Sequence, residues 1–117
     1  MISFELWRGP ELVAGEIGCA TGCSFTSFSG FFTGNGTGTI QMALTAKVLE
    51  AFGFTLWDLG QEHAYKLMHG ASMMPRDNFL CEFRRARGQK SGLDEFILGR
   101  VGEDGQFHGG DLLKPRL

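Results

Sequence analysis

The first part of the chain shows the alternation of apolar and polar residues that is typical of half-buried β-strands. In the segment Ile2–Arg8 apolar residues occupy positions 2, 4 and 6, and Gly9-Pro10 follows as a turn signal. A second strand is predicted over Leu12–Ala20 and, after the turn residues Thr21-Gly22, a third over Cys23–Phe28. Short strands joined by tight turns pair with their neighbours, so we predict an antiparallel meander.

After the third strand, apolar residues recur at the spacing of a helix. A glycine-rich segment comes first, Thr33–Thr39 with the sequence TGNGTGT, and Gly53 ends the predicted helix. The apolar positions of this helix are Ile40, Ala43, Leu44, Val48, Ala51 and Phe52. Phe54–Leu59 returns as a strand, and a strand, a helix and a strand in succession require a right-handed parallel crossover. We therefore predict an α/β (α+β) fold with a mixed sheet, in which the antiparallel meander becomes parallel at its far edge.

The following segments predict two more helices and one short strand. Helical spacing extends over Gln61–His69, and Gly70 follows, as expected just past a helix end. A short strand at Ala71–Met74 and a helix from Pro75 to Arg87 complete a domain that we place at residues 1–87. Periodicity fades beyond this point, so we expect Gly88–Leu117 to be a tail that packs loosely or is partly disordered.

Composition narrows the class of protein. The 117 residues are 43% hydrophobic, which is enough for the core of one domain. The sequence contains no apolar run of about 18 residues, so no membrane span is predicted. The first residues lack the charge pattern of a secretory signal. The three cysteines are odd in number and include no C-x2-C pair, so we expect neither a disulfide framework nor a metal site. We expect a cytoplasmic protein.

Two groups of residues are candidates for binding phosphate. Gly34, Gly36 and Gly38 precede a helix N-terminus, which exposes N–H groups, but a flexible connection explains the same glycines equally well. Their spacing matches neither the dinucleotide fingerprint nor the P-loop. Basic residues also cluster between positions 76 and 90 despite a net charge of −2, either as a phosphate-binding patch or as a solvated helix face. They are Arg76, Arg84, Arg85, Arg87 and Lys90.

Three segments carry motifs in a recognisable order: ELVAGEIG at Glu11–Gly18, an aromatic run before Gly30, and LWDLGQEHAYKLMHGASMMPRDNF at Leu56–Phe79. Together they resemble the leucyl/phenylalanyl-tRNA–protein transferase family. Its members move an amino acid from a charged tRNA onto the N-terminus of a protein and so mark that protein for degradation. The resemblance covers about Ile2 to Arg87, without the N-terminal portion that helps the family to hold tRNA. It implies a GNAT-type acyltransferase fold, the 3′ end of an aminoacyl-tRNA and a protein N-terminus as partners, and no cofactor, DNA or membrane.

The resemblance also assigns catalytic roles to individual residues. Asp58 matches an acid at the end of a strand, where it can accept the proton of the attacking amine or position that amine. Gly60 stands where the family has a functional amide, so Gln61, one position later, is the candidate for that amide. Ser29 fits the family pattern and offers a hydroxyl.

A pocket for the side chain of the transferred amino acid is implied as well, and it is expected to be aromatic. Phe25 and Phe31 match its aromatic positions, and Trp57 lies next to Asp58. Two positions depart from the pattern: Phe28 replaces an acidic residue, and Glu16 replaces an apolar one. Two other functions stay open. One is an acyl-CoA-dependent N-acyltransferase that holds pyrophosphate on the glycine loop, and the other is a non-catalytic binding module of the same fold.

Overall fold

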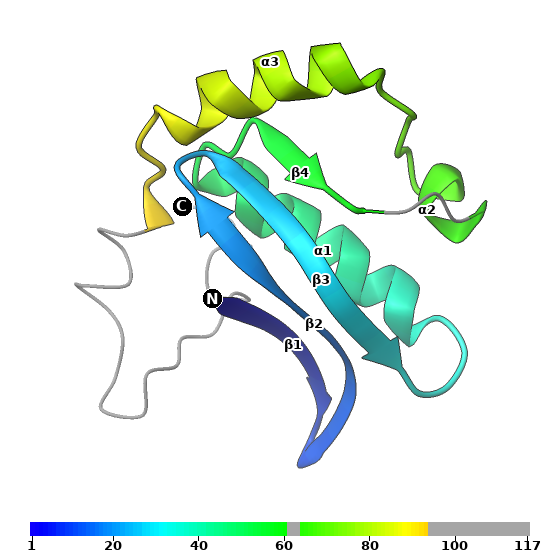
Figure 1. The fold of residues 1–117 in the computed structure, drawn as a ribbon. Helices are drawn as coiled ribbons and strands as arrows, with labels where there is room; N and C mark the ends of the chain where they lie inside the picture. The colour runs from blue at the N-terminus through cyan, green and yellow to red at the C-terminus, as the bar shows by residue number, and fades with distance from the viewer. Residues whose placement is uncertain (61–63, 94–117) are drawn as a thin grey trace, which may run out of the picture.

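A mixed sheet of four strands forms the centre of the computed structural model, which describes residues 1–60 and 64–93 (Figure 1). The strands are β1 (Ile2–Arg8), β2 (Glu11–Thr21), β3 (Ser24–Phe32) and β4 (Leu56–Asp58), and they lie in that order across the sheet. The first three are antiparallel, and β4 pairs with β3 in parallel. The predicted meander and its parallel far edge are therefore confirmed.

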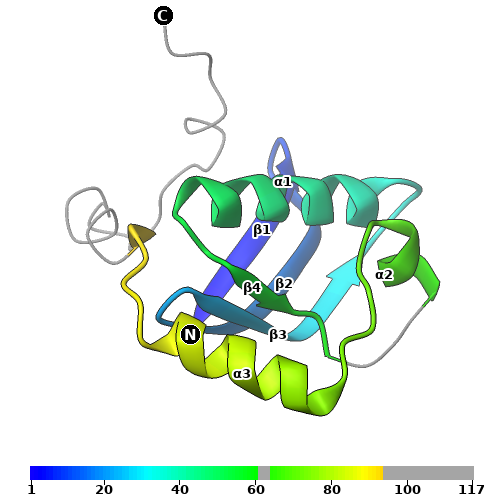
Figure 2. The same ribbon diagram turned by 90° about the horizontal axis from the view of Figure 1, so that it is seen from above.

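Helices lie on both sides of the β3–β4 edge. The long helix α1 (Thr37–Ala51) is the crossover between β3 and β4, and α3 (Arg76–Arg87) runs along the other side of these two strands (Figure 2). Along the chain, α2 (Ala64–Met68) lies between β4 and α3. It is a short helix that ends before Gly70, whose φ is 96°. The expected helix over Gln61–His69 is thus present in its described part, while positions 61–63 lie outside the described residues.

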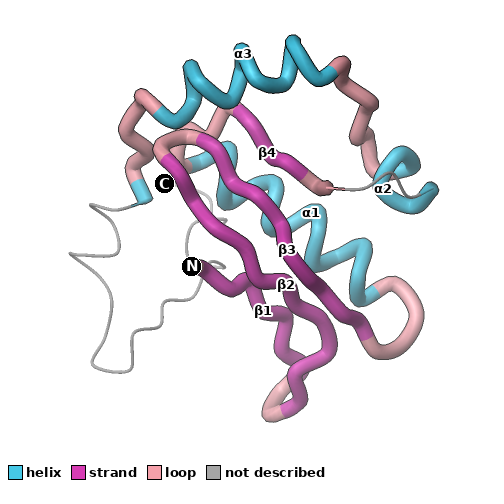
Figure 3. The backbone as a smooth tube through the Cα atoms, viewed as in Figure 1, coloured by secondary structure: helices cyan, strands magenta, loops and turns pink. Residues whose placement is uncertain are grey.

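Three strand predictions needed correction. The strand β3 continues to Phe32, because β2 is long enough to pair with it up to Ala14, whereas the prediction ended at Phe28. By contrast, β4 is shorter than the strand predicted at Phe54–Leu59, since only Leu56, Trp57 and Asp58 pair with β3. The strand predicted at Ala71–Met74 was wrong: this segment is an irregular connection to α3, visible as a loop in Figure 3. It pairs with no described strand.

The orientation of α1 also differs from the prediction. The helix starts at Thr37, after Gly36 with a φ of 81°, which is earlier than the first apolar position of the predicted face. Its apolar residues Ile40 and Leu44 are 52% and 36% exposed. Val48 is buried as predicted, and the other residues turned inward are Thr37, Gln41, Thr45 and Leu49. The inner face is therefore polar in its first half, and the cause lies in the carboxylate opposite it.

The apolar core lies between the sheet and the second half of α1. Phe25 is fully buried and packs edge-to-face on Phe4, with ring centroids 5.2 Å apart. Gly18 leaves room for this ring, since a Cβ there would lie 2.6 Å from Phe25 Cζ. Residues 88–93 of the expected tail are anchored, because Gly92 N donates to Phe52 O at 2.9 Å and Leu93 is 2% exposed. Positions 94–117 lie outside the described residues. No helix in the described part of the chain has the length and apolarity to span a membrane.

Candidate functional site

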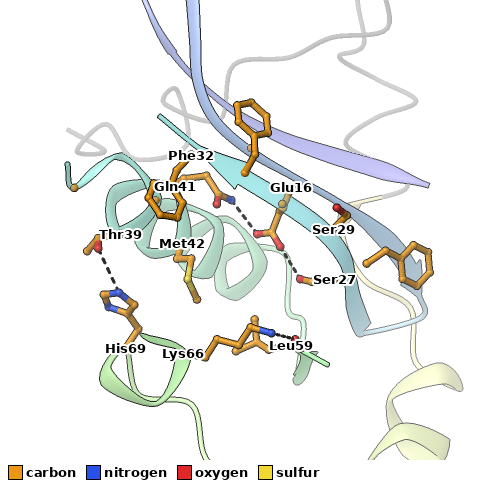
Figure 4. A pocket seen from close by; sticks show the side chains of 16 residues that line it. Glu16, Ser27, Ser29, Phe32, Thr39, Gln41, Met42, Leu59, Lys66 and His69 are labelled. Atoms are coloured by element: carbon orange, nitrogen blue, oxygen red, sulfur yellow. Dashed lines mark hydrogen bonds between the residues drawn. The ribbon is translucent and has the colours of Figure 1, made fainter. Parts of the chain in front are cut away.

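A cleft of about 680 Å³ opens between the middle of β2, the far half of β3 and the first turns of α1. Glu16, Ser27 and Gln41 form one wall of it, and Lys66 and His69 lie on the opposite wall (Figure 4). We call it the Glu16 cleft. Four elements contribute side chains to it, so the cleft exists only when the crossover around α1 is complete.

Glu16 lies at the centre of a chain of hydrogen bonds in this cleft, although it is only 9% exposed. Gln41 Nε2 donates to Glu16 Oε1 at 2.9 Å and to Thr45 Oγ1 at 2.8 Å. Ser27 Oγ donates to Glu16 Oε2 at 2.6 Å and accepts a hydrogen bond from Trp57 Nε1 at 2.8 Å. A buried carboxylate needs such donors to replace water, which explains why α1 turns Gln41 and Thr45 toward the sheet.

The opposite wall of the Glu16 cleft carries the basic residues. Lys66 Nζ donates to the carbonyl oxygen of Leu59 at 2.6 Å. His69 Nε2 lies 3.3 Å from Thr39 Oγ1 on α1. The cleft therefore has an acidic wall on the sheet and a basic wall near α2.

The predicted aromatic residues divide between the cleft and the core. Phe28 and Phe31 line the cleft together with Phe32, and they are 58%, 46% and 67% exposed. Phe28 is the unpaired residue of a β-bulge between β2 and β3, because Ile17 pairs with Ser29 and Gly18 with Ser27. A bulge redirects side chains, and here Ser27 and Phe28 both line the cleft. Phe25, in contrast, belongs to the core and does not line the Glu16 cleft.

The predicted catalytic residues fall in different places. Ser29 is exposed and lines the Glu16 cleft. Asp58 and Trp57 line a second cavity of about 700 Å³, which shares Leu59, Lys66 and other residues with the first. The Oδ1 atom of Asp58 accepts a hydrogen bond from Gly60 N at 2.9 Å, as in a turn stabilised by an aspartate side chain. Gln61 lies outside the described residues.

The glycine-rich loop borders the Glu16 cleft. Gly34 and Gly36 have φ angles of 80° and 81°, which other residues rarely adopt. Gly38 lies in the first turn of α1, where a Cβ would meet the ring of Phe32 at 3.2 Å. Gly36 and Gly38 line the cleft, whereas Gly34 does not. The loop closes on itself through Thr37 Oγ1, which donates to Thr33 O at 2.7 Å.

The basic cluster lies at the other end of β3. Its residues Arg84, Arg85 and Arg87 are exposed in the last turn of α3, and Arg85 pairs with Glu82 at 3.4 Å. This end of α3 abuts the β2–β3 turn, because Cys23 N donates to Ala86 O at 2.9 Å. The Glu16 cleft, however, uses the opposite half of β3. Arg76, at the start of α3, is the arginine of the cluster that lines the second cavity.

Sequence reasoning missed the polar partners of Glu16. Ser27 lies within the predicted strand Cys23–Phe28, and Gln41 is not among the apolar positions of the predicted helix. One signal was available: Thr37, Gln41 and Thr45 recur at i, i+4 and i+8, which forms a polar stripe on a helix. A polar stripe on a crossover helix, opposite a strand with an acid among small residues, indicates a buried polar pair.

Comparison with known proteins places most of the described fold in one family. Residues 1–84 match the family model described as leucyl/phenylalanyl-tRNA protein transferase. The leucyl/phenylalanyl-tRNA–protein transferase of Nitratidesulfovibrio vulgaris is 32% identical over 82% of this chain and 41% of its own length. Those of Xanthomonas campestris and Xylella fastidiosa are 36% and 37% identical over 67% and 71% of this chain, and 31% and 34% of their own lengths. This chain thus spans about two fifths or less of the curated relatives it matches. It belongs to the leucyl/phenylalanyl-tRNA–protein transferase family.

Proposed function

We propose that this chain carries out, or forms part of, an aminoacyl-tRNA–protein transfer reaction in the cytoplasm. An amino acid would pass from the 3′ end of a tRNA to the N-terminus of a protein, as a tag for degradation by the N-end rule. The observation that carries this proposal is the Glu16 cleft, which lies within the family match at residues 1–84. The order of three strands, a crossover helix and a parallel strand supports a GNAT-type acyltransferase fold.

The proposed reaction is the aminolysis of an ester. A neutral amine attacks the carbonyl carbon of the aminoacyl ester, a C–N bond forms, and the C–O bond to the ribose breaks. The amine loses a proton, and the ribose oxygen gains one. Precise placement of the two reactants supplies much of the rate enhancement. The protein must also accept one proton near the amine and offer donors to the oxyanion that develops on the carbonyl oxygen.

We assign the proton-accepting role to Asp58, which lines the cavity next to the Glu16 cleft. One oxygen of this carboxylate, Oδ1, is held by Gly60 N, which fixes the orientation of the group. Ser29 lines the Glu16 cleft, although it pairs with Ile17 and its hydroxyl therefore faces away from Glu16; Leu59 and Lys66 belong to both cavities. The ester and the amine would therefore meet where the two cavities adjoin, beside Leu59 and Lys66. Gln61 stays a candidate for the family's amide.

Two features support contact with tRNA phosphates. Gly36 and Gly38 bring the N-terminus of α1 to the edge of the Glu16 cleft, near the place where the 3′ end would lie. The arginines at the end of α3 lie beside the β2–β3 turn, at the other end of β3 from the cleft, so we assign them to the acceptor stem rather than to its terminal nucleotide. They would act through charge, with an affinity that falls steeply with salt.

The test is a binding comparison followed by a transfer assay. The full chain is titrated with leucyl-tRNA, with uncharged tRNA and with acetyl-CoA, and the proposal expects tightest binding to the aminoacylated tRNA. Preference for acetyl-CoA would instead favour an acyl-CoA-dependent N-acyltransferase. Binding of tRNA without any turnover would favour the non-catalytic module.

Substitution of Asp58 tests the mechanism. Asp58→Asn keeps the size of the side chain and an oxygen for Gly60 N, but it cannot accept the proton. We expect the rate of transfer to fall by about 10²-fold or more. The matched control is Asp77→Asn, which removes the same charge from an exposed residue in the first turn of α3. Equal rates for Asp58→Asn and wild type would remove Asp58 from the mechanism.

A further inference from the structure

The Glu16 carboxylate has no cationic partner in the part of the chain that the structure describes. Its hydrogen-bond donors are the hydroxyl of Ser27 and the amide of Gln41, and both are neutral. The ion pairs found among residues 1–60 and 64–93 are Lys47–Glu50 and Arg85–Glu82, which lie on the surface. Glu16 is therefore a 91% buried acid that faces a cleft and is held only by neutral donors.

Such an arrangement favours a positively charged ligand group. A carboxylate offers about four lone-pair positions on its two oxygens, and Ser27 and Gln41 occupy one on each. Burial strengthens attraction to an opposite charge, and a hydrogen bond between two charged groups is stronger than one between neutral groups. The approach is open, because Gly30 stands directly opposite Glu16 in the sheet and presents no side chain to the cleft.

The rest of the cleft determines where that charge can lie and what carries it. Lys66 and His69 occupy the opposite wall, so a cation is favoured only on the side of Glu16 (Figure 4). Phe28 and Phe32 are among the residues that line the cleft, and the ring of Phe32 lies against Gly38 at the start of α1, which gives an apolar surface that suits an alkyl chain. The complementary ligand is therefore a flexible aliphatic chain that ends in a primary ammonium.

We propose that Glu16 is the specificity-determining residue of this cleft, and that it binds the terminal ammonium of a lysine-type side chain. The identification of this side chain as that of the transferred amino acid rests on the proposed transfer function. On that basis the chain would use a cationic aminoacyl group, in contrast to the leucyl and phenylalanyl groups in the names of its relatives. The binding itself does not depend on tRNA.

The first experiment measures binding with two probes that share a pentyl chain and differ in their head group, one a charged ammonium and the other a neutral hydroxyl. The full chain is titrated with n-pentylammonium and with 1-pentanol, followed by NMR at the indole N–H of Trp57. This group is linked to Glu16 through Ser27, whereas the indole of Trp7 donates to Glu5 elsewhere and serves as an internal control. We expect pentylammonium to bind about tenfold more tightly than pentanol or better, with a shift at Trp57 and none at Trp7.

The same titrations with two variants assign the preference to Glu16. Glu16→Gln removes the charge but keeps a side chain that can bond to Ser27 and Gln41, so the two probes should then bind equally. The control Glu50→Gln removes an exposed charge from the far end of α1 and should keep the preference. Equal affinity for both probes in the wild type, or an unchanged preference in folded Glu16→Gln, would overturn the proposal. An unchanged dispersion of the NMR spectrum verifies that the variant is folded.

A transfer assay separates this inference from the proposed function. Lysyl-tRNA and leucyl-tRNA are compared as donors, and we expect the wild type to prefer lysyl-tRNA and Glu16→Gln to lose that preference. No transfer from either donor would refute transfer by this chain on its own, while a preference for pentylammonium would still uphold Glu16 as an ammonium site. Preference for leucyl-tRNA would overturn the assignment of the cationic group to the transferred amino acid.

Discussion

Replacement of Ser27 by alanine removes one hydroxyl that joins two parts of the polar chain in the cleft. Its Oγ donates to Glu16 at 2.6 Å and accepts from Trp57 at 2.8 Å, so the variant leaves both partners short of one hydrogen bond. A bond to a charged group contributes about 1.5–3 kcal/mol and a neutral one about 1 kcal/mol. We therefore expect the free energy of unfolding to fall by about 2–4 kcal/mol.

Urea denaturation measures this loss directly. With a denaturant slope of about 2 kcal/mol per molar, the midpoint should fall by about 1–2 M in Ser27→Ala. Ser29→Ala is the matched control, because Ser29 lies on the same strand but is exposed, and its midpoint should move by about 0.2 M or less. If Ser27→Ala unfolds at the wild-type midpoint, with an unchanged slope, then the hydroxyl does not hold the carboxylate and the reasoning about this buried acid fails.

Two further predictions concern the sheet and the basic cluster. Gly18→Ala should destabilise the fold by about 3 kcal/mol or more, because the added Cβ would lie 2.6 Å from Phe25 Cζ; Gly92→Ala, with its nearest neighbour at 3.6 Å, should change the unfolding midpoint far less. Replacing three exposed arginines of α3 by alanine should weaken tRNA binding and flatten its dependence on salt. An unchanged affinity would identify the cluster as a solvated face. These arginines are Arg84, Arg85 and Arg87.

The strands of the meander and the crossover helix could be predicted because alternation, turn residues and helical spacing are patterns of neighbouring residues. Alternation over Ile2–Arg8 predicted β1 with its bounds, and the turn glycines predicted the hairpins. The end of β3 did not follow, because the pairing of Phe31 and Phe32 depends on residues of β2 that are distant in sequence. The same cause explains the missing strand at Ala71–Met74, whose apolar residues border a cavity and find no strand to pair with.

The residues that the sequence assigned to one site lie in three places. Phe28, Phe31 and Ser29 line the Glu16 cleft, Asp58 and Trp57 line the second cavity, and Phe25 lies in the core. The partners of Glu16 were not expected, because a buried acid selects its donors in three dimensions. A hydrophobic pattern ranks Ile40 above Gln41 as the inward residue, whereas the cost of an unsatisfied carboxylate reverses that order.

The hydrogen-bond chain around Glu16 also decides when the site exists during folding. Its links join residues that are 11, 25 and 30 positions apart in the sequence. Contacts of that range form only after the entropy of closing the intervening loops has been overcome. The meander can pair early, but the cleft needs α1 and then β4 to dock. Local opening of the β4 edge, which is held by three residue pairs, would therefore release Trp57 from Ser27 while the meander stays paired. Hydrogen exchange at the Trp57 indole should then be faster than in the backbone amides shared by β1 and β2.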